Sequence, residues 1–518
     1  MSENIQQESR VKKTLLNARV NLIFYFITLV LSFFSRKIFL NCLGASFIGL
    51  TGTMQNLLGF LNLAELGIGS AIGFVLYKPL FEHDRTKISE IISVMGYLYR
   101  WIGFIILGSG IILSFFLPLI FPDSNTGFSL SLIYFVYYTF LTTSLIGYFI
   151  NYRQNLLGAD QRNYVVTGYF QSMNILKMII QMILAYYTGS YFLWVIIELT
   201  FGIIYSFIIN WKINQTYPWL KTQITRVREL LKEHHIIIVK TRQIFIHKIA
   251  SFAQFQTVPF LTYAFVNLHT VALYGNYTII TDKLSSLLTS VVGSNDAGVG
   301  NVVAEGNKQK TINVFWELTS LRYFVAGFFC FSILILTNPF IKLWLGQEYI
   351  LHDIILYLLV TNLFLRICQG AVMPFIWGYG MYGDVWSPIA EIILNIGFAV
   401  SFGSVWGLPG ILLGGIASIF IIYHIWKPIY LFHFAFKISM LKYVSGTLIR
   451  MICTILPGII TIYSLKFITT ISPFSNFGTW LLYGAISVGI YTMLLTLCLY
   501  SFNPSFRQLI SRFIKSKR

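Results

Sequence analysis

The sequence is a succession of long apolar stretches separated by short connections that hold most of the charged residues. Of its 518 residues, 56% are hydrophobic and only 11% are charged, whereas about 25% of the residues of a soluble domain are charged. So few charges cannot cover a surface that faces water, and lipid must therefore surround most of the chain. Because a membrane-spanning helix needs about 20 apolar residues, the stretches predict an all-α integral membrane protein with about fourteen transmembrane helices. The predicted helices cover residues 17–40, 46–77, 89–120, 127–150, 164–187, 190–211, 243–267, 270–299, 312–338, 352–377, 384–405, 409–432, 444–467 and 476–502.

The basic residues predict how the chain is oriented in the membrane. Lys and Arg outnumber Asp and Glu by 37 to 19, which taken alone would suggest a nucleic-acid partner. The basic residues gather, however, in every second connection, as they do in the cytoplasmic loops of membrane proteins, so nucleic acid is excluded. The opposite set of connections holds little beyond Lys342 and Lys466. Both termini are therefore predicted to be cytoplasmic, in a membrane that the chain crosses many times.

A short internal repeat predicts two related halves. Four residues of the first half recur in the second half at a constant offset of 226 positions. Two-fold internal repeats are common in transporters, whose substrate sites lie between the halves. The matching pairs are Asn41 and Asn267, Gly49 and Gly275, Gly67 and Gly293, and Ala71 and Ala297.

The longest non-apolar stretch, 212–242, divides six predicted helices from the remaining eight. Its apolar residues recur at helical spacing among basic ones, which is typical of an amphipathic helix on the membrane surface or of a solvated linker helix. The predicted organisation is a cytoplasmic tail (1–16), an N-terminal six-helix lobe (17–211), a cytoplasmic linker with an amphipathic helix (212–242), a C-terminal six-helix lobe (243–437), and two extra helices with a basic cytoplasmic tail (438–518).

Several cations fall inside the predicted helices. A charge at membrane depth costs about 2.5–3.5 kcal/mol, so it usually faces protein or a water-filled cavity. Cations around one cavity would attract a phosphate-bearing substrate, Arg through its planar fork and Lys as a point charge. Each of them would equally well form a structural ion pair or reach the headgroups. The candidates for a cationic substrate site are Arg36, Arg100, Lys177, Lys283, Arg322 and Arg366.

Amides and carboxylates accompany these cations in the predicted helices. The amides would line a wet cavity or bond between packed helices, which is their commoner use in membranes. A carboxylate would pair with a cation, bind Na⁺ or carry a proton. The candidate cavity-lining residues are Gln55, Asn62, Gln171, Asn174 and Asn276, and the candidates for ion coupling are Glu65, Asp282, Glu198 and Glu391.

Signs of enzyme chemistry are missing from the sequence. Gly67, Gly69 and Gly73 follow no strand and precede no GK[ST] motif, so they form no nucleotide loop. The sequence has no HExxH or GxSxG motif, and its five cysteines have no metal-ligand or CxxC spacing. The predicted external connections, such as 187–190 and 406–408, are very short. We therefore expect no catalytic residue, no metal site and no cofactor beyond a coupled Na⁺ or H⁺, and an ATP-driven pump is disfavoured.

Three segments resemble a known family. The residues LGASFIGLTGTMQNLLGFLNLAELGIGSAIGFVLYKPL, HDRTKISEII and YRQNLLGADQRNY resemble the polysaccharide transporters of the multidrug/oligosaccharidyl-lipid/polysaccharide (MOP) exporter superfamily. The resemblance implies two pseudo-symmetric six-helix lobes in a V around a central cavity, with two extra C-terminal helices. It also implies a flippase in the bacterial cytoplasmic (inner) membrane. This flippase would move an undecaprenyl-pyrophosphate-linked oligosaccharide from the inner to the outer leaflet, for lipopolysaccharide O-antigen, capsule or exopolysaccharide synthesis. Glycosyltransferases or a polymerase of that pathway are the expected protein partners.

Three alternatives remain open. A cation-coupled multidrug exporter of the same superfamily would usually have twelve helices and acidic cavity residues, so the predicted pair at 444–502 argues against it. A lipid II flippase would differ only in the sugar that it carries. A membrane enzyme such as a polysaccharide polymerase would need a sizeable external loop with catalytic residues, which the sequence lacks.

Overall fold

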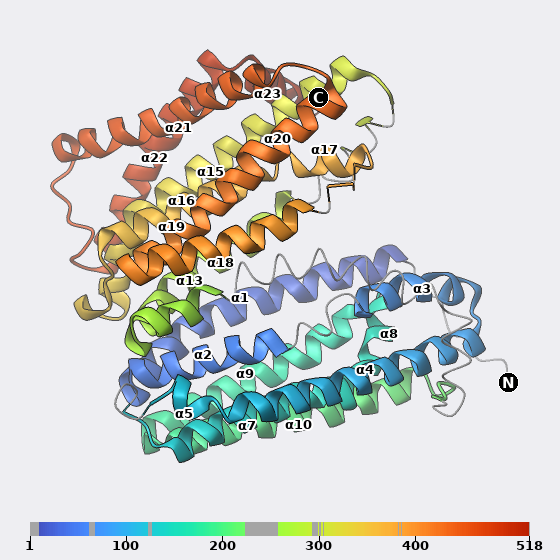
Figure 1. Cartoon of the computed structure of the whole chain (residues 1–518). Helices are drawn as coiled ribbons and strands as arrows, with labels where there is room; N and C mark the ends of the chain where they lie inside the picture. Colours follow the sequence, from blue (N-terminus) through green and yellow to red (C-terminus); the bar gives the residue numbers. More distant parts are fainter. Residues whose placement is uncertain are drawn as a thin grey trace. The chain divides into compact units, whose positions relative to one another are not determined.

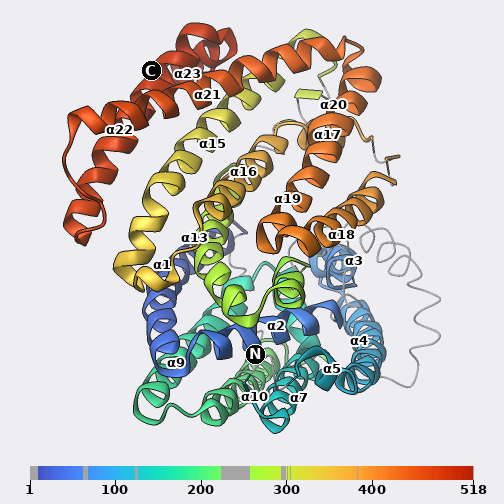
Figure 2. The same cartoon turned by 60° about the vertical axis from the view of Figure 1, so that its left-hand side comes forward.

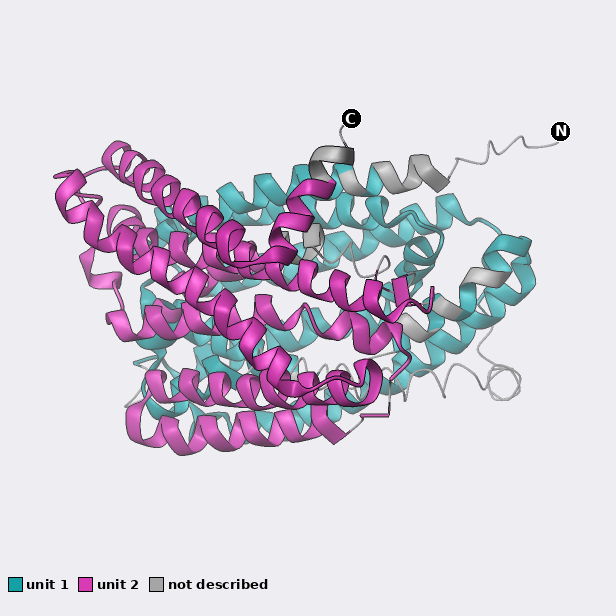
Figure 3. Ribbon diagram, turned by 90° about the horizontal axis from the view of Figure 1, so that it is seen from above, with its two compact units in different colours: residues 1–272 teal, residues 273–518 magenta. Residues whose placement is uncertain are grey.

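The computed structural model describes residues 10–61, 68–122, 127–222, 257–292, 299, 302–303, 305–381, 383–384 and 386–516. These residues form helices joined by short connections, and no β-strand occurs among them (Figure 1). They belong to two compact units, Met1–Ala272 and Leu273–Arg518 (Figure 3). Ten of the described helices are long and apolar enough to cross a membrane. The predicted class, an all-helical multi-pass membrane protein, is confirmed, and the count of fourteen helices stays a prediction.

Unit 1 is a bundle in which α1 packs along α9 and α7 packs between α4 and α10. An apolar surface that faces lipid explains why these helices carry large exposed side chains such as Phe104 and Phe207. The elements of unit 1 are α1 (Arg10–Leu43), α2 (Ala45–Leu61), α3 (Ile68–Glu82), α4 (Arg85–Ser114), α5 (Leu117–Ile120), α7 (Leu130–Phe149), η2 (Asn151–Arg153), α8 (Gln154–Ala159), α9 (Asn163–Thr188) and α10 (Tyr191–Thr216).

Polar residues and one glycine set the ends of these helices. The side chains of Asp84 and Ser190 accept the backbone N–H groups of the first turns of α4 and α10, which have no partner inside the helix. Gly189 ends α9 with a φ of +59°, a left-handed conformation that costs glycine little. Local sequence therefore places the turn between α9 and α10, the two helices that carry Lys177 and Glu198.

Unit 2 contains most of α13 and all the helices that follow. The α16 helix packs on α15 and α19, and α22 packs on α15 and α21 (Figure 2). The elements are α13 (Leu268–Val292), α15 (Lys308–Trp344), η4 (Gln347–Tyr349), α16 (Asp353–Gln369), α17 (Met373–Gly378), α18 (Trp386–Trp406), α19 (Leu408–Ile419), η5 (Phe420–Trp426), α20 (Lys427–Tyr430), η6 (Leu431–Phe436), α21 (Met440–Ile468), α22 (Phe477–Phe502) and α23 (Pro504–Ser516).

The antiparallel helices α18 and α19 are in backbone contact. A Cβ atom at Gly410 would overlap the carbonyl of Phe402, and a Cβ atom at Gly414 would overlap the backbone of Ala399. Small residues four apart let two membrane helices approach this closely. The close approach fixes the rotation of α19, and with it the direction in which the following η5 and α20 present their polar side chains.

The C-terminal helices dock on α15 through a buried arginine. Arg450 on α21 is 5% exposed, and its guanidinium carbon lies 4.4 Å from the ring centroid of Trp316. Its Nε donates to Ser320 Oγ (3.0 Å) and its Nη2 to Asn503 Oδ1 (3.1 Å). Further along α15, the rings of Phe331 and Tyr491 stack at 4.1 Å. These contacts join α21 and α22 to the rest of unit 2.

Candidate functional site

The mid-membrane cations of unit 1 differ in their surroundings. Arg36 on α1 is half-buried, and its Nη2 donates to the carbonyl of Ala272 at 2.7 Å. Arg100 is half-buried at the middle of α4 and forms no hydrogen bond or ion pair with any residue that the structure describes. A half-buried arginine at this depth is costly unless an anion or water compensates its charge, so Arg100 is the cation of unit 1 best suited to a ligand.

Lys177 and Glu198, a candidate substrate cation and a candidate coupling carboxylate, form an ion pair between α9 and α10. Lys177 Nζ lies 2.6 Å from Glu198 Oε1, and each side chain is only 17% exposed. Gln181 Nε2 donates to Glu198 Oε2 (3.1 Å) and to the carbonyl of Trp194 (3.0 Å). The pair therefore neutralises itself and has further hydrogen bonds, which is what a buried ion pair needs.

Asn174 and Gln171 lie on the same face of α9 as Lys177, about one and two helical turns before it. Both are half-buried, and their side chains form no hydrogen bond with any described residue. Residues three apart on a helix project from one face. This face of α9 thus presents two amides with free hydrogen-bonding capacity. Of the other polar candidates in unit 1, Gln55 is exposed on α2, and Asn62 and Glu65 lie outside the described residues.

Two candidate cations of unit 2 meet at one end of α16. Arg366 Nε donates to Asn362 Oδ1 one turn earlier at 2.6 Å. Arg322 on α15 lies against the backbone of Gly370, where a Cβ atom would come within 2.5 Å of its Nη1. Gly370 ends α16, and the carbonyl end of a helix attracts cations. The absence of a side chain at residue 370 therefore makes room for Arg322.

Arg366 also interacts with acidic candidates. Its charge is within electrostatic reach of Glu391 on α18 and Asp282 on α13, so residues predicted for substrate binding and for ion coupling lie together in unit 2. Lys283 is half-buried and Asn276 is fully buried on the same helix, α13. Arg366 on α16 is therefore within electrostatic reach of carboxylates on two other helices, α13 and α18.

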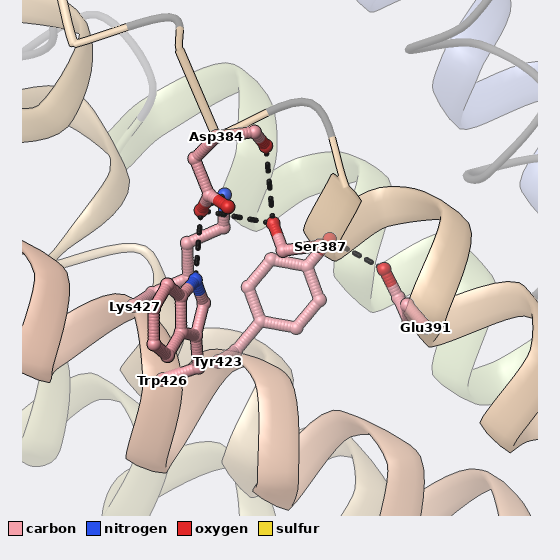
Figure 4. Close-up of polar contacts among 6 residues, drawn as sticks. All are labelled: Asp384, Ser387, Glu391, Tyr423, Trp426 and Lys427. Carbon is pink, nitrogen blue, oxygen red and sulfur yellow. Dashed lines mark hydrogen bonds and ion pairs between the residues drawn. The ribbon is translucent and has the colours of Figure 1, made fainter.

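A second set of polar residues lies around the start of α18 (Figure 4). Asp384 Oδ2 accepts hydrogen bonds from Lys427 Nζ (2.7 Å), Trp426 Nε1 (3.0 Å) and Ser387 Oγ (2.9 Å). Asp384 and Lys427 are 6% and 5% exposed, and Asp384 Oδ1 has no hydrogen-bond partner in the described part of the chain. Three donors thus share one oxygen of a deeply buried carboxylate.

One turn further along α18 from Ser387, Glu391 is also buried. It is 2% exposed, and its Oε2 accepts the hydroxyl of Tyr423 on η5 at 2.7 Å. Because Arg366 is within electrostatic reach of Glu391, the polar groups form a line from Asp384 to α16. Such a line inside apolar helices is expensive unless every charge is compensated, which favours a functional reason for it.

Sequence reasoning missed Asp384, Tyr423 and Lys427. Asp384 is the first residue of the predicted helix 384–405, and Lys427 lies near the end of the predicted helix 409–432, so neither was chosen as a candidate. The turn at Gly407 could have indicated that the two charges lie close together. Asp384 lies 23 residues before Gly407, and Lys427 lies 20 residues after it. An antiparallel helix pair of that spacing brings the two charges to the same level.

Unit 2 also has a large apolar cavity of about 700 Å³ between α15, α16, η5 and α21. Its walls include Phe331, Phe364, Ile425, Met451 and Ile459, with few polar atoms. A cavity with such walls is suited to hydrocarbon rather than to a sugar or a phosphate. In the described residues no group of three or more His, Cys, Asp or Glu could hold a metal ion.

Comparisons with solved structures identify the fold. The structure of the lipid II flippase MurJ in an inward closed conformation matches with a TM-score of 0.65 over 92% of this chain and 98% of that chain, at 15% identity. An inward-facing multidrug resistance MATE family transporter of the MOP superfamily matches with a TM-score of 0.59 over 80% and 98% of the two chains, at 16% identity.

The chain has the fold of MOP-superfamily transporters. No protein-family profile matches the sequence, and no curated protein sequence matches it. The MOP fold agrees with the superfamily that the sequence resembles, and both neighbours are transport proteins rather than enzymes.

Proposed function

We propose that the chain is a flippase for an anionic, lipid-linked oligosaccharide. The substrate is an undecaprenyl-pyrophosphate-linked repeat unit, moved from the inner to the outer leaflet of a bacterial cytoplasmic membrane for surface polysaccharide synthesis. The observation that carries the proposal is Arg100, a half-buried cation midway along a membrane-spanning helix with no counter-ion among the described residues. A pyrophosphate would supply the missing negative charge.

The proposed function requires movement of the substrate across the membrane and no covalent step. A polar head must cross about 30 Å of hydrocarbon, while its lipid tail stays in apolar surroundings. Arg100 in unit 1 and the cations beside α16 in unit 2 are each proposed to bind the headgroup at some stage of the cycle. Two alternating conformations would expose the headgroup to either side of the membrane in turn. With both termini in the cytoplasm, the membrane potential would favour outward movement of an anion by about 2.3 kcal/mol per charge per 100 mV.

The remaining groups have proposed roles in the same cycle. The amides of Gln171 and Asn174 would bind sugar hydroxyls, because both have unused donors and acceptors. The apolar cavity of unit 2 would hold part of the polyprenyl chain. Asp282 and Glu391, both within electrostatic reach of Arg366, are the proposed sites of coupling to Na⁺ or H⁺. Glycosyltransferases or a polymerase of the same pathway would be the protein partners.

Reconstitution into proteoliposomes tests the proposal. The intact chain should move a fluorescent undecaprenyl-pyrophosphate-linked oligosaccharide between leaflets, and Arg100→Ala should abolish movement while the protein still inserts. Arg507→Ala is the matched control, because Arg507 is exposed on α23. Wild-type rates in the Arg100→Ala variant would contradict the substrate site.

Two other substrates are favoured by specific observations. The MurJ match makes lipid II an alternative that differs in the sugar. The MATE match makes a cationic drug the other alternative, although that match covers less of the chain. Assaying lipid II in the same proteoliposomes, and drug susceptibility of cells that express the chain, separates the three substrates.

A further inference from the structure

The candidate membrane span Leu408–Phe436, which precedes α21, is not an α-helix throughout. After α19 the chain enters the π-helical segment η5, returns to an α-helix at α20, and enters a second π-helical segment, η6. The backbone N–H of Lys427 donates to the carbonyl of Ile422, and that of Lys437 to Phe432. Both bonds reach back five residues instead of four. π-Helical turns are rare in proteins and are frequently found at functional sites.

The register of η5 decides where Lys427 points. A π turn holds one residue more than an α turn, and one residue corresponds to a rotation of about 100° about the helix axis. If η5 became α-helical while α19 kept its place, Lys427 and everything after it would turn by about 100°. The side chain of Lys427 would then point where Pro428 points now.

Contacts on both sides of η5 hold the π register. Before η5, Gly410 and Gly414 are in backbone contact with α18, which prevents α19 from rotating. After η5, Lys427 Nζ lies 2.7 Å from Asp384 Oδ2, and Trp426 Nε1 bonds to the same oxygen. Asp384 lies two residues before the start of α18, and Figure 4 shows its contacts with Trp426 and Lys427. The α18–α19 hairpin therefore holds both ends of η5.

We propose that η5 is a register switch and that the Asp384–Lys427 ion pair is its latch. With the pair intact, η5 stays π-helical. With the pair broken, η5 relaxes to an α-helix and turns α20 and η6. The latch is suited to release, because all three donors to Asp384 share Oδ2 while Oδ1 has no partner in the described residues, and a buried ion pair only partly repays its desolvation. The switch goes beyond the proposed function, because it is a property of unit 2 whatever the chain carries.

The exposure pattern of η6 gives a direct readout of the register. Phe432 and Phe436 are fully buried, His433 and Phe434 are exposed, and Ala435 is half-buried. In the α register each residue would take the direction that its successor has now. Residue 433 would therefore stay exposed, whereas residue 434 would become half-buried. A probe at 433 is thus an internal reference for a probe at 434.

Nitroxide labels at 433 or 434, in a full-length background without the five native cysteines, test the switch in lipid nanodiscs. In the chain with the ion pair, both labels should be accessible to oxygen. In Asp384→Asn and in Lys427→Met, accessibility at 434 should fall by about half relative to 433, because the helix turns by about 100°. The double exchange Asp384→Lys with Lys427→Asp should restore the original ratio.

The matched control is Lys310→Met, which removes a lysine from an exposed ion pair with Glu305 in the same unit. This control should leave the ratio unchanged. If neither single variant at the latch gives folded protein, the neutral double variant Asp384→Asn with Lys427→Met is measured instead. An unchanged ratio in the latch variants, or the same change in Lys310→Met, would overturn the proposal.

Discussion

Asn17 on α1 caps helix α9 from across the bundle of unit 1. Its Oδ1 accepts the backbone N–H of Tyr164 at 2.6 Å, and its Nδ2 donates to the carbonyl of Gln161 at 2.9 Å. The helix's own N-cap residue, Arg162, makes no side-chain cap. One amide therefore satisfies the start of α9 and joins it to α1, within the segment YRQNLLGADQRNY that resembles polysaccharide transporters.

Replacing this cap should weaken unit 1. Asn17→Ala should lower the free energy of unfolding by about 1 kcal/mol, the usual cost of losing an N-cap. Thermal unfolding in detergent micelles measures the change. Asn21→Ala is the matched control, since Asn21 is an exposed asparagine on the same helix. Equal melting temperatures for the two variants would show that the cap contributes nothing.

Variants of the Lys177–Glu198 ion pair can distinguish an effect on stability from an effect on transport. Lys177→Ala leaves Glu198 buried without its cation, and breaking a buried pair in this way costs about 3–5 kcal/mol. The yield of folded protein should therefore fall. Lys177→Met combined with Glu198→Gln removes both charges and should restore the yield, as measured by size-exclusion chromatography after extraction.

Transport by that double variant then decides whether the pair takes part in transport. A restored yield with wild-type transport would make the pair structural. A restored yield without transport would give the pair a role in the cycle, through Lys177 at the substrate or through Glu198 in ion coupling.

The contact between α18 and α19 should be sensitive to side-chain volume. Gly414→Leu would force the backbones of the two helices apart, and overpacking of this kind costs about 1–3 kcal/mol. Gly397→Leu is the matched control, because no atom lies within 4 Å of a Cβ atom at Gly397 on α18. Unfolding temperatures in micelles should fall for Gly414→Leu and stay unchanged for the control. A stable Gly414→Leu protein would contradict the close approach.

The sequence predicted the membrane class because long apolar stretches can be recognised from the order of the residues, without knowledge of the tertiary structure. It also selected Lys177, Glu198, Arg366 and Glu391 as costly charges at depth. It could not show that Lys177 and Glu198 neutralise each other, since that depends on how α9 and α10 are rotated about their axes. Spacing along one helix determines which residues share a face, but not which neighbouring helix that face meets.

The region around Glu391 was less predictable. Asp384 and Lys427 were overlooked because they stand near the ends of predicted helices, where charge normally faces water or headgroups. Their burial depends on tertiary packing, including the backbone contact of α18 and α19 at Gly410 and Gly414. The π turns of η5 left no clear trace in the sequence either, because their apolar residues fit an α-helix as well.

Gly370 offers a test of the cations beside α16 that changes no charge. Its φ of −63° suits any residue, so Gly370→Ala adds a methyl group without straining the backbone. That methyl group would meet the guanidinium of Arg322 at 2.5 Å and displace it. If Arg322 binds the pyrophosphate, Gly370→Ala should retain the fold and reduce transport, and Arg322→Ala should have the same effect.

The control is Gly383→Ala, because the nearest atom to a Cβ atom at Gly383 is Tyr430 Oη at 3.7 Å. Loss of transport in Arg322→Ala with full transport in Gly370→Ala would mean that Arg322 acts from a position that the methyl group does not disturb.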